Sequence, residues 1–166
     1  YYSTICAIQL QSKVAPLRVQ QFAATFPESV WMPSINLQLG KLFFEDNQYK
    51  QVLEAFQKVA PKQLDQEQRA EFYYKKGYSQ MKLDQLDGAL SSFSQVTKTK
   101  SDYSRPAYYY SAHIEYQKGN FNKALIGFKA IENDKKYAKY AQNYIIHIYY
   151  EQGKYQKVID EGTVFL

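Results

Sequence analysis

The chain of 166 residues has little of what several common protein classes require. It has a single cysteine, Cys6, which excludes an intramolecular disulfide framework and a cysteine zinc cluster. Its uninterrupted apolar runs are only a few residues long, so no segment of the sequence is expected to span a bilayer. Five prolines and seven glycines are few for this length. Because Cys6 lies in an apolar run typical of a helix, we expect it to be a small buried side chain.

The sequence also lacks the motifs of common catalytic and metal sites. It has no glycine-rich phosphate loop, no nucleophile elbow, no His-Glu-x-x-His and no paired cysteines. His113 and His147 take equivalent places in adjacent repeats, described below, but we interpret them as ordinary polar residues of a groove rather than as metal ligands. We therefore predict that the chain is not an enzyme and holds neither a cofactor nor a metal.

The charge is modest and evenly spread. The net charge is +5, with 21 basic against 16 acidic residues. The excess is +1 in residues 1–50, +2 in residues 51–100 and +2 in residues 101–166. Only three basic residues are arginine, which is the residue best suited to bidentate phosphate contacts. A nucleic-acid surface would concentrate its charge, so we do not expect a nucleic-acid partner.

The chain does contain an internal repeat. Four segments align at offsets of 37, 35 and 34 residues. Each has a small or aliphatic residue, then an aromatic residue or leucine nine positions later, then apolar residues three, seven and ten positions further on. These intervals place the later residues on one face of a helix. The sets are Gly40, Tyr49, Val52, Phe56 and Val59; Gly77, Leu86, Ala89, Phe93 and Val96; Ala112, Phe121, Ala124, Phe128 and Ile131; and Ile146, Tyr155, Val158, Gly162 and Phe165, where Gly162 breaks the pattern.

Each repeat reads as an antiparallel pair of helices joined by a tight turn. The turns suit a residue in the left-handed conformation that closes the first helix. Residues 1–30 look like one more pair that lacks its start, with Pro16 in the first turn of its second helix and Pro27 at its end. The chain begins and ends in helix-like runs, so we expect a fragment of a longer protein. The predicted first helices are 31–45, 67–82, 106–118 and 137–152, and the predicted turns are Asp46-Asn47, Leu83-Asp84, Lys118-Gly119-Asn120 and Gln152-Gly153.

The pattern resembles the tetratricopeptide repeat (TPR), most clearly in residues 112–128. The stretch from Phe22 to Ser29, running into residues 36–40, further resembles the TPR proteins of the Gram-negative cell envelope. The likeness implies an all-α fold, a right-handed superhelical α-solenoid of antiparallel helix pairs. It also suggests a bacterial periplasmic or outer-membrane-associated location. The expected boundaries are a partial repeat at 1–30 and repeats at 31–65, 66–101, 102–135 and 136–166.

Seventeen tyrosines are many for a chain of this length. In a stacked array of helix pairs the first helices line the concave face, and on them a stripe at i, i+4 and i+7 is rich in tyrosine. Tyrosine offers a large contact area at low entropic cost together with a hydroxyl group. Whether the stripe is an open groove or partly inter-helix core stays open from sequence, whereas Tyr73, Tyr108 and Tyr144 are expected in the core. The stripe, with Tyr140 one turn before its last set, comprises Lys41, Phe44, Tyr74, Tyr78, Met81, Tyr109, His113, Tyr116, Tyr140, Asn143, His147 and Tyr150.

We therefore predict a non-catalytic scaffold for protein–protein interactions that binds a protein or peptide in a tyrosine-lined concave groove. Two alternatives remain. The first is an RNA-binding module of the pentatricopeptide kind, because those repeats are also helical pairs and the chain is basic. The second is a glycan-binding TPR domain, because tyrosine rings can stack on sugars.

Overall fold

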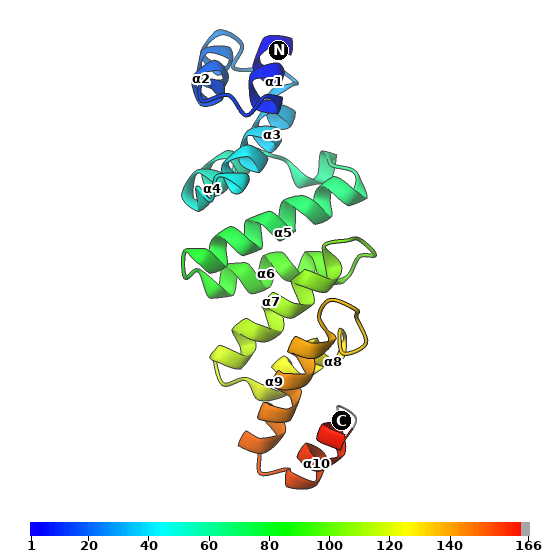
Figure 1. Cartoon of the computed structure of the whole chain (residues 1–166). Coiled ribbons are helices and arrows are strands. Elements are labelled where there is room, and N and C mark those ends of the chain that lie inside the picture. Colours follow the sequence, from blue (N-terminus) through cyan, green and yellow to red (C-terminus); the bar gives the residue numbers. More distant parts are fainter. Residues whose placement is uncertain (164–166) are drawn as a thin grey trace. The chain divides into compact units, whose positions relative to one another are not determined.

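The computed structural model describes residues 1–163, and in that range it contains helices and turns but no strand. Figure 1 shows the order of the helices along the chain. The chain divides into two compact units, residues 1–92 and residues 93–166, and the boundary falls within one helix. We describe each unit by itself.

The first unit holds the helices up to the boundary. Within it α1 packs on α2, α3 packs on α4, and α5 packs on α4 and α3. A hydrogen bond of 2.6 Å from the Ser92 hydroxyl to the Gln80 side-chain oxygen joins α6 to α5. The elements are α1 (Tyr2–Gln9), α2 (Ala15–Thr25), α3 (Met32–Glu45), α4 (Tyr49–Phe56), the short 3₁₀ helix η1 (Pro61–Gln63), α5 (Gln66–Lys82) and the first part of α6 (Leu86–Thr97).

The second unit, taken by itself, is also built of paired helices. Here α7 packs on α8, α8 on α9, and α9 on α10. It contains the rest of α6, then α7 (Ser104–Gln117), α8 (Phe121–Lys129), α9 (Ala138–Glu151) and α10 (Tyr155–Thr163).

The four predicted turns are confirmed, and a fifth of the same kind joins α1 to α2. At each turn one residue has a positive φ, and the next residue donates its backbone N–H to a carbonyl five positions earlier, a Schellman-type closure of the first helix. These bonds are 2.8–2.9 Å long. The recurrence makes α1 and α2 a helix pair like the others. The positive-φ residues are Gln11 (50°), Asn47 (58°), Asp84 (58°), Gly119 (73°) and Gly153 (68°).

Asp84 adopts the left-handed conformation at its turn although it carries a Cβ atom, which is unfavourable in that region. Replacing Asp84 with glycine should therefore raise the free energy of unfolding by about 0.5–1 kcal/mol. Replacing Asp84 with alanine removes the same carboxylate but keeps the Cβ, so this control should destabilise the chain. Urea unfolding followed by circular dichroism measures both. Equal stability of the two variants would contradict the argument.

The predicted apolar faces of the second helices are buried in the first three repeats, whereas in the last repeat Tyr155 is 62% exposed and Val158 is only half-buried. The core of the second unit contains Ala124, Phe128 and Ile131 from the repeat pattern, packed with Ala141, Ile145 and Ile148 of α9. The first unit has two clusters. One joins α1, α2 and α3 through Ile8, Ala15, Val19, Ile35, Leu39 and Leu42, and the other joins α3, α4 and α5 through Leu37, Val52, Phe56, Val59 and Phe72.

Small residues let paired helices approach closely at two points. A Cβ atom at Gly40 of α3 would overlap the ring of Phe56 on α4. A Cβ atom at Gly127 of α8 would lie 2.8 Å from the Cβ of Ala112 on α7. In these two repeats the small residue of the first helix, Gly40 or Ala112, therefore faces the partner helix.

Three expectations differ from the structure or fall outside it. Cys6 is exposed, because the short helix α1 buries Thr4 and Ile8 and Cys6 lies on another face. Helix α7 begins at Ser104, so Pro106 lies in its first turn rather than at its start. Phe165, which completes the last repeat pattern, lies outside the described residues.

The all-α class and the helix pairs are thus confirmed, whereas the right-handed superhelix and the repeat boundaries stay predictions. None of the helices in residues 1–163 combines the length and the apolar character needed to cross a membrane.

Candidate functional site

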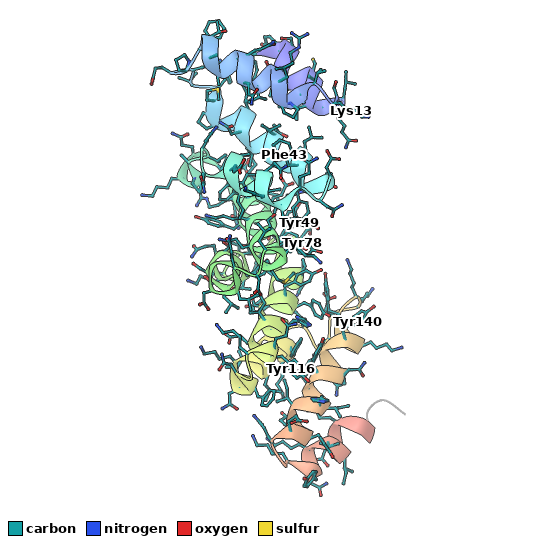
Figure 2. The ribbon with its side chains drawn as sticks, turned by 90° about the vertical axis from the view of Figure 1, so that its left-hand side faces the viewer. Lys13, Phe43, Tyr49, Tyr78, Tyr116 and Tyr140 are labelled. Atoms are coloured by element: carbon teal, nitrogen blue, oxygen red, sulfur yellow. The ribbon has the colours of Figure 1, made fainter. Side chains whose placement is uncertain are left out.

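The predicted stripe divides between the two units. In the first unit, Phe44 of α3 lies edge to face with Tyr78 of α5, their ring centroids 5.5 Å apart. Tyr49 lies next to Tyr78 as well, at 5.9 Å, and Figure 2 shows the two side by side. Tyr74 and Tyr78 are 6.3 Å apart on α5, and Met81 is half-buried one turn later. Phe44 also packs against the core of α3, α4 and α5. The aromatic rings among these side chains form a layer that Phe44 joins to the core.

The remaining stripe residue of the first unit, Lys41, belongs to a network of charged side chains. Lys41 forms an ion pair with Glu71 of α5, so its ammonium group is bound within the chain. The buried Lys75 pairs with Glu45 at 2.7 Å and with Glu71 at 3.7 Å, and its ammonium lies 4.4 Å from the centre of the Phe44 ring. This network joins α3 to α5.

In the second unit the predicted side chains surround a hollow between α7 and α9, with a volume of about 350 Å³. Two of them, Tyr116 on α7 and Tyr140 on α9, are labelled in Figure 2. The full lining is Tyr109, Tyr116, Tyr140, Asn143, Tyr144 and His147. Four of the six are tyrosines, and the other two can donate and accept hydrogen bonds. We call this cavity the tyrosine hollow.

Two rings of the tyrosine hollow, those of Tyr144 and Tyr116, are fixed by contacts with neighbouring side chains. Tyr144 stacks on the buried Phe128, with ring centroids 4.6 Å apart and planes 3° from parallel. Tyr116 meets Tyr144 at 5.0 Å and a steep angle of 67°. The Tyr116 hydroxyl forms a hydrogen bond of 2.9 Å with Nδ1 of His147. The walls are therefore preformed by packing and by this hydrogen bond between the two helices.

Burial and neighbouring groups raise the pKa values of two tyrosines of the hollow. Burial raises the pKa of Tyr109, as do the neighbouring hydroxyls of Tyr144, Tyr140 and Tyr137. The pKa of Tyr116 is raised by burial and by the carboxylate of Glu151. Both hydroxyls therefore keep their protons at neutral pH and can donate hydrogen bonds.

His113 lies against the rings of Tyr109 and Tyr144, with centroids 6.3 and 5.7 Å away. Burial lowers the pKa of His113 below 6.5. The unfolded chain then binds this proton at a higher pH than the folded chain does, so stability should fall as the pH drops from 6.5 to the folded pKa. The imidazole titration followed by proton NMR should give a midpoint below 6.5, and a His113→Gln variant should lose this part of the pH dependence. A midpoint at or above 6.5 would contradict the argument.

The structure brings five of the predicted residues together in the tyrosine hollow and places the rest elsewhere. His113 is half-buried and is absent from the lining, and Tyr150 is exposed beside Tyr155, their rings 5.9 Å apart. Tyr144, expected in the core, packs against the core and also lines the hollow, a role that was not predicted. The sequence does indicate this position, because residues 140, 144 and 147 follow the same i, i+4, i+7 spacing as the stripe. Tyr73 and Tyr108 are half-buried rather than fully buried.

Among the described residues no group of three or more histidine, cysteine and acidic side chains could hold a metal. His147 does lie close to one carboxylate, with its Nε2 3.8 Å from Glu151. This is an ion pair only when the imidazole is protonated.

Comparison with known proteins connects the chain to a fold. No model of a known protein family matches it. No curated protein matches it in sequence. Several solved structures match in fold, among them two with MamA in their titles. The crystal structure titled MamA has a TM-score of 0.69 and 18% identity over 89% of this chain and 82% of that one. The crystal structure titled MamA protein has a TM-score of 0.74 and 17% identity over 96% of this chain and 88% of that one.

MamA is a TPR-type helical solenoid, and at these identities the likeness concerns the fold alone. The TPR-type fold predicted from sequence is thereby confirmed. The resemblance to envelope proteins gains no support from these matches, and the location stays a prediction.

Proposed function

We propose that this chain is a non-catalytic interaction module, and that the tyrosine hollow binds an extended peptide segment of a protein partner. The observation that carries the proposal is the lining: six side chains from two helices surround one open cavity, and every one of them combines apolar surface or a ring with a hydrogen-bonding group. Such a lining can contact a peptide broadly and fix its orientation.

The geometry supports binding rather than catalysis. The pKa values of Tyr109 and Tyr116 are raised, which favours hydrogen-bond donation and disfavours a phenolate nucleophile. The TPR-type fold supports the same reading, since stacked helix pairs create extended binding surfaces. The RNA-binding and glycan-binding alternatives have no comparable support from the fold comparisons.

Selection from a random peptide library tests the proposal. A library of dodecapeptides displayed on phage is selected on the immobilised chain, and the enriched peptides are synthesised and titrated. We expect them to bind a Tyr140→Ala variant at least tenfold more weakly, because Tyr140 is 56% exposed and contributes a ring to the hollow.

The matched control is Tyr2→Ala, which removes an exposed tyrosine from α1, outside the hollow. It should bind the selected peptides as the unchanged chain does. Enriched peptides that bind the Tyr140→Ala variant with unchanged affinity would contradict the proposal, as would a selection that enriches nothing.

A further inference from the structure

We infer that the segment bound in the tyrosine hollow is proline-rich and lies there as a polyproline II helix. This inference rests on the proposed function and specifies the partner by its chemistry. Four features of the hollow carry it: its length, the angles of its rings, its hydrogen-bonding groups and the absence of formal charge on its tyrosines and Asn143.

The length of the hollow matches one turn of polyproline II. Tyr109 and Tyr116 lie seven positions apart on α7, and Tyr140 and His147 lie seven positions apart on α9. At 1.5 Å per residue each pair spans roughly 10 Å along its helix. Polyproline II rises about 3.1 Å per residue, so a turn of three residues is about 9 Å long. Each wall is therefore long enough for one turn of such a helix.

The rings meet at steep angles and so leave notches between them. Tyr109 and Tyr140 face each other across the two helices, their ring centroids 6.1 Å apart and their planes at 67°. Tyr116 and Tyr144 make the same angle at 5.0 Å. A polyproline II helix presents flat pyrrolidine rings as ridges, and aromatic-lined grooves bind such ridges.

The hydrogen-bond donors of the hollow suit a ligand whose backbone can only accept hydrogen bonds. Proline has no backbone N–H, so a proline segment offers carbonyl oxygens alone. Tyr140 and Asn143 both carry donors and are exposed, and within residues 1–163 neither side chain makes a hydrogen bond. A phenol hydroxyl and an amide are therefore available to the peptide carbonyls.

The charges favour proline over a cationic side chain, which is the main competing occupant of a cage of tyrosines. The tyrosines and Asn143 carry no formal charge at neutral pH, and the carboxylate beside the hollow, Glu151, already lies 3.8 Å from Nε2 of His147. The chain places lysines over other rings, such as Lys136 over Tyr137 at 5.4 Å. In the described part of the chain no lysine or arginine lies over the four rings of the hollow.

Both partners would be ordered before they meet. Tyr144 is fixed by its stacking on Phe128, and Tyr116 by its hydrogen bond to His147. Polyproline II is a preformed conformation of low entropy in the free peptide. Binding therefore loses little conformational freedom, which permits a useful affinity in a site of about 350 Å³.

Fluorescence anisotropy with a labelled decaproline peptide tests the inference, with an alternating Gly-Ser decapeptide of the same length as the control ligand. We expect decaproline to bind at least about tenfold more tightly than the Gly-Ser peptide. Tyr140→Ala should weaken decaproline at least about tenfold. Tyr140→Phe and Asn143→Ala should each weaken it about three- to fivefold by removing one donor. Tyr2→Ala should leave it unchanged, and far-ultraviolet circular dichroism checks that every variant remains folded.

Several results would overturn the inference. One is a decaproline affinity no greater than that of the Gly-Ser peptide, and another is an unchanged affinity in Tyr140→Ala. Tighter, salt-sensitive binding of an alternating Gly-Lys decapeptide would assign the hollow to a cationic side chain instead. A further outcome combines two results: decaproline does not bind, and the enriched library peptides contain no proline but bind Tyr140→Ala more weakly. This outcome would refute the inference and leave the proposed function standing.

Discussion

Replacing Phe128 with alanine is expected to lower the free energy of unfolding of the second unit by about 4 kcal/mol. Phe128 is fully buried in the core formed by α7, α8, α9 and α10. Its removal leaves a cavity and also takes away the ring on which Tyr144 stacks at 4.6 Å. The change should therefore weaken peptide binding as well, because Tyr144 loses the support that fixes its orientation.

Ile126 provides the control on the same helix. It is 72% exposed, so Ile126→Ala should change the free energy of unfolding by less than about 0.5 kcal/mol. Urea unfolding followed by circular dichroism, with Trp31 fluorescence reporting on the first unit, separates the two units. A loss below about 1.5 kcal/mol for Phe128→Ala would show that the core is not packed as described.

The second large effect is expected at Lys75. Replacing it with alanine should lower the free energy of unfolding of the first unit by about 3 kcal/mol. The side chain is 9% exposed, and it lies between α3 and α5 with Glu45, Glu71 and the Phe44 ring around its ammonium group. Alanine removes the ion pairs and the cation–π contact, and it also removes the buried methylene stem.

Two further variants separate these contributions. Lys75→Met keeps most of the stem and removes the charge, so it should cost less than Lys75→Ala, about 1–2 kcal/mol. Lys50→Ala on the exposed side of α4 should cost less than about 0.5 kcal/mol. Equal stability of Lys75→Ala and the unchanged chain would contradict the buried network. All are measured by urea unfolding.

The fold was largely predictable because its signals are local and repeated. Asn47, Asp84, Gly119 and Gly153 are residue types that tolerate a left-handed conformation, and all four turns lie where the sequence places them. Gln11 makes the same turn without such a residue, so the turn between α1 and α2 could not be read locally. The helix pair itself was still visible from Pro16 and Pro27, which mark the ends of its second helix. Cys6 was misplaced because a helix as short as α1 gives too few apolar positions to define a buried face.

The site was only partly predictable because it depends on contacts between distant residues. Helical spacing identified Tyr109, Tyr116, Tyr140 and His147 as neighbours on one surface, and these line the hollow. Spacing cannot show that Lys41 is bound by Glu71, because the partner lies on another helix. Nor can it show that Tyr144 stacks on Phe128 while it lines the hollow. The choice between groove and core has no single answer, since Tyr109, Tyr116 and Tyr144 pack against the core and line the cavity at once.

If the tyrosine hollow between α7 and α9 binds a peptide, as we propose, its lining residues should respond when the peptide is added. Amide chemical-shift mapping of the ¹⁵N-labelled chain, titrated with decaproline or with a peptide enriched from the library, tests it most directly. We expect the largest shifts on the lining of the hollow, at Tyr116, Tyr140 and Asn143 and their neighbours in α7 and α9. Ile126 of α8 and the helices of the first unit should stay unchanged. Shifts concentrated on α8, on α10 or in the first unit, with these residues unmoved, would contradict it.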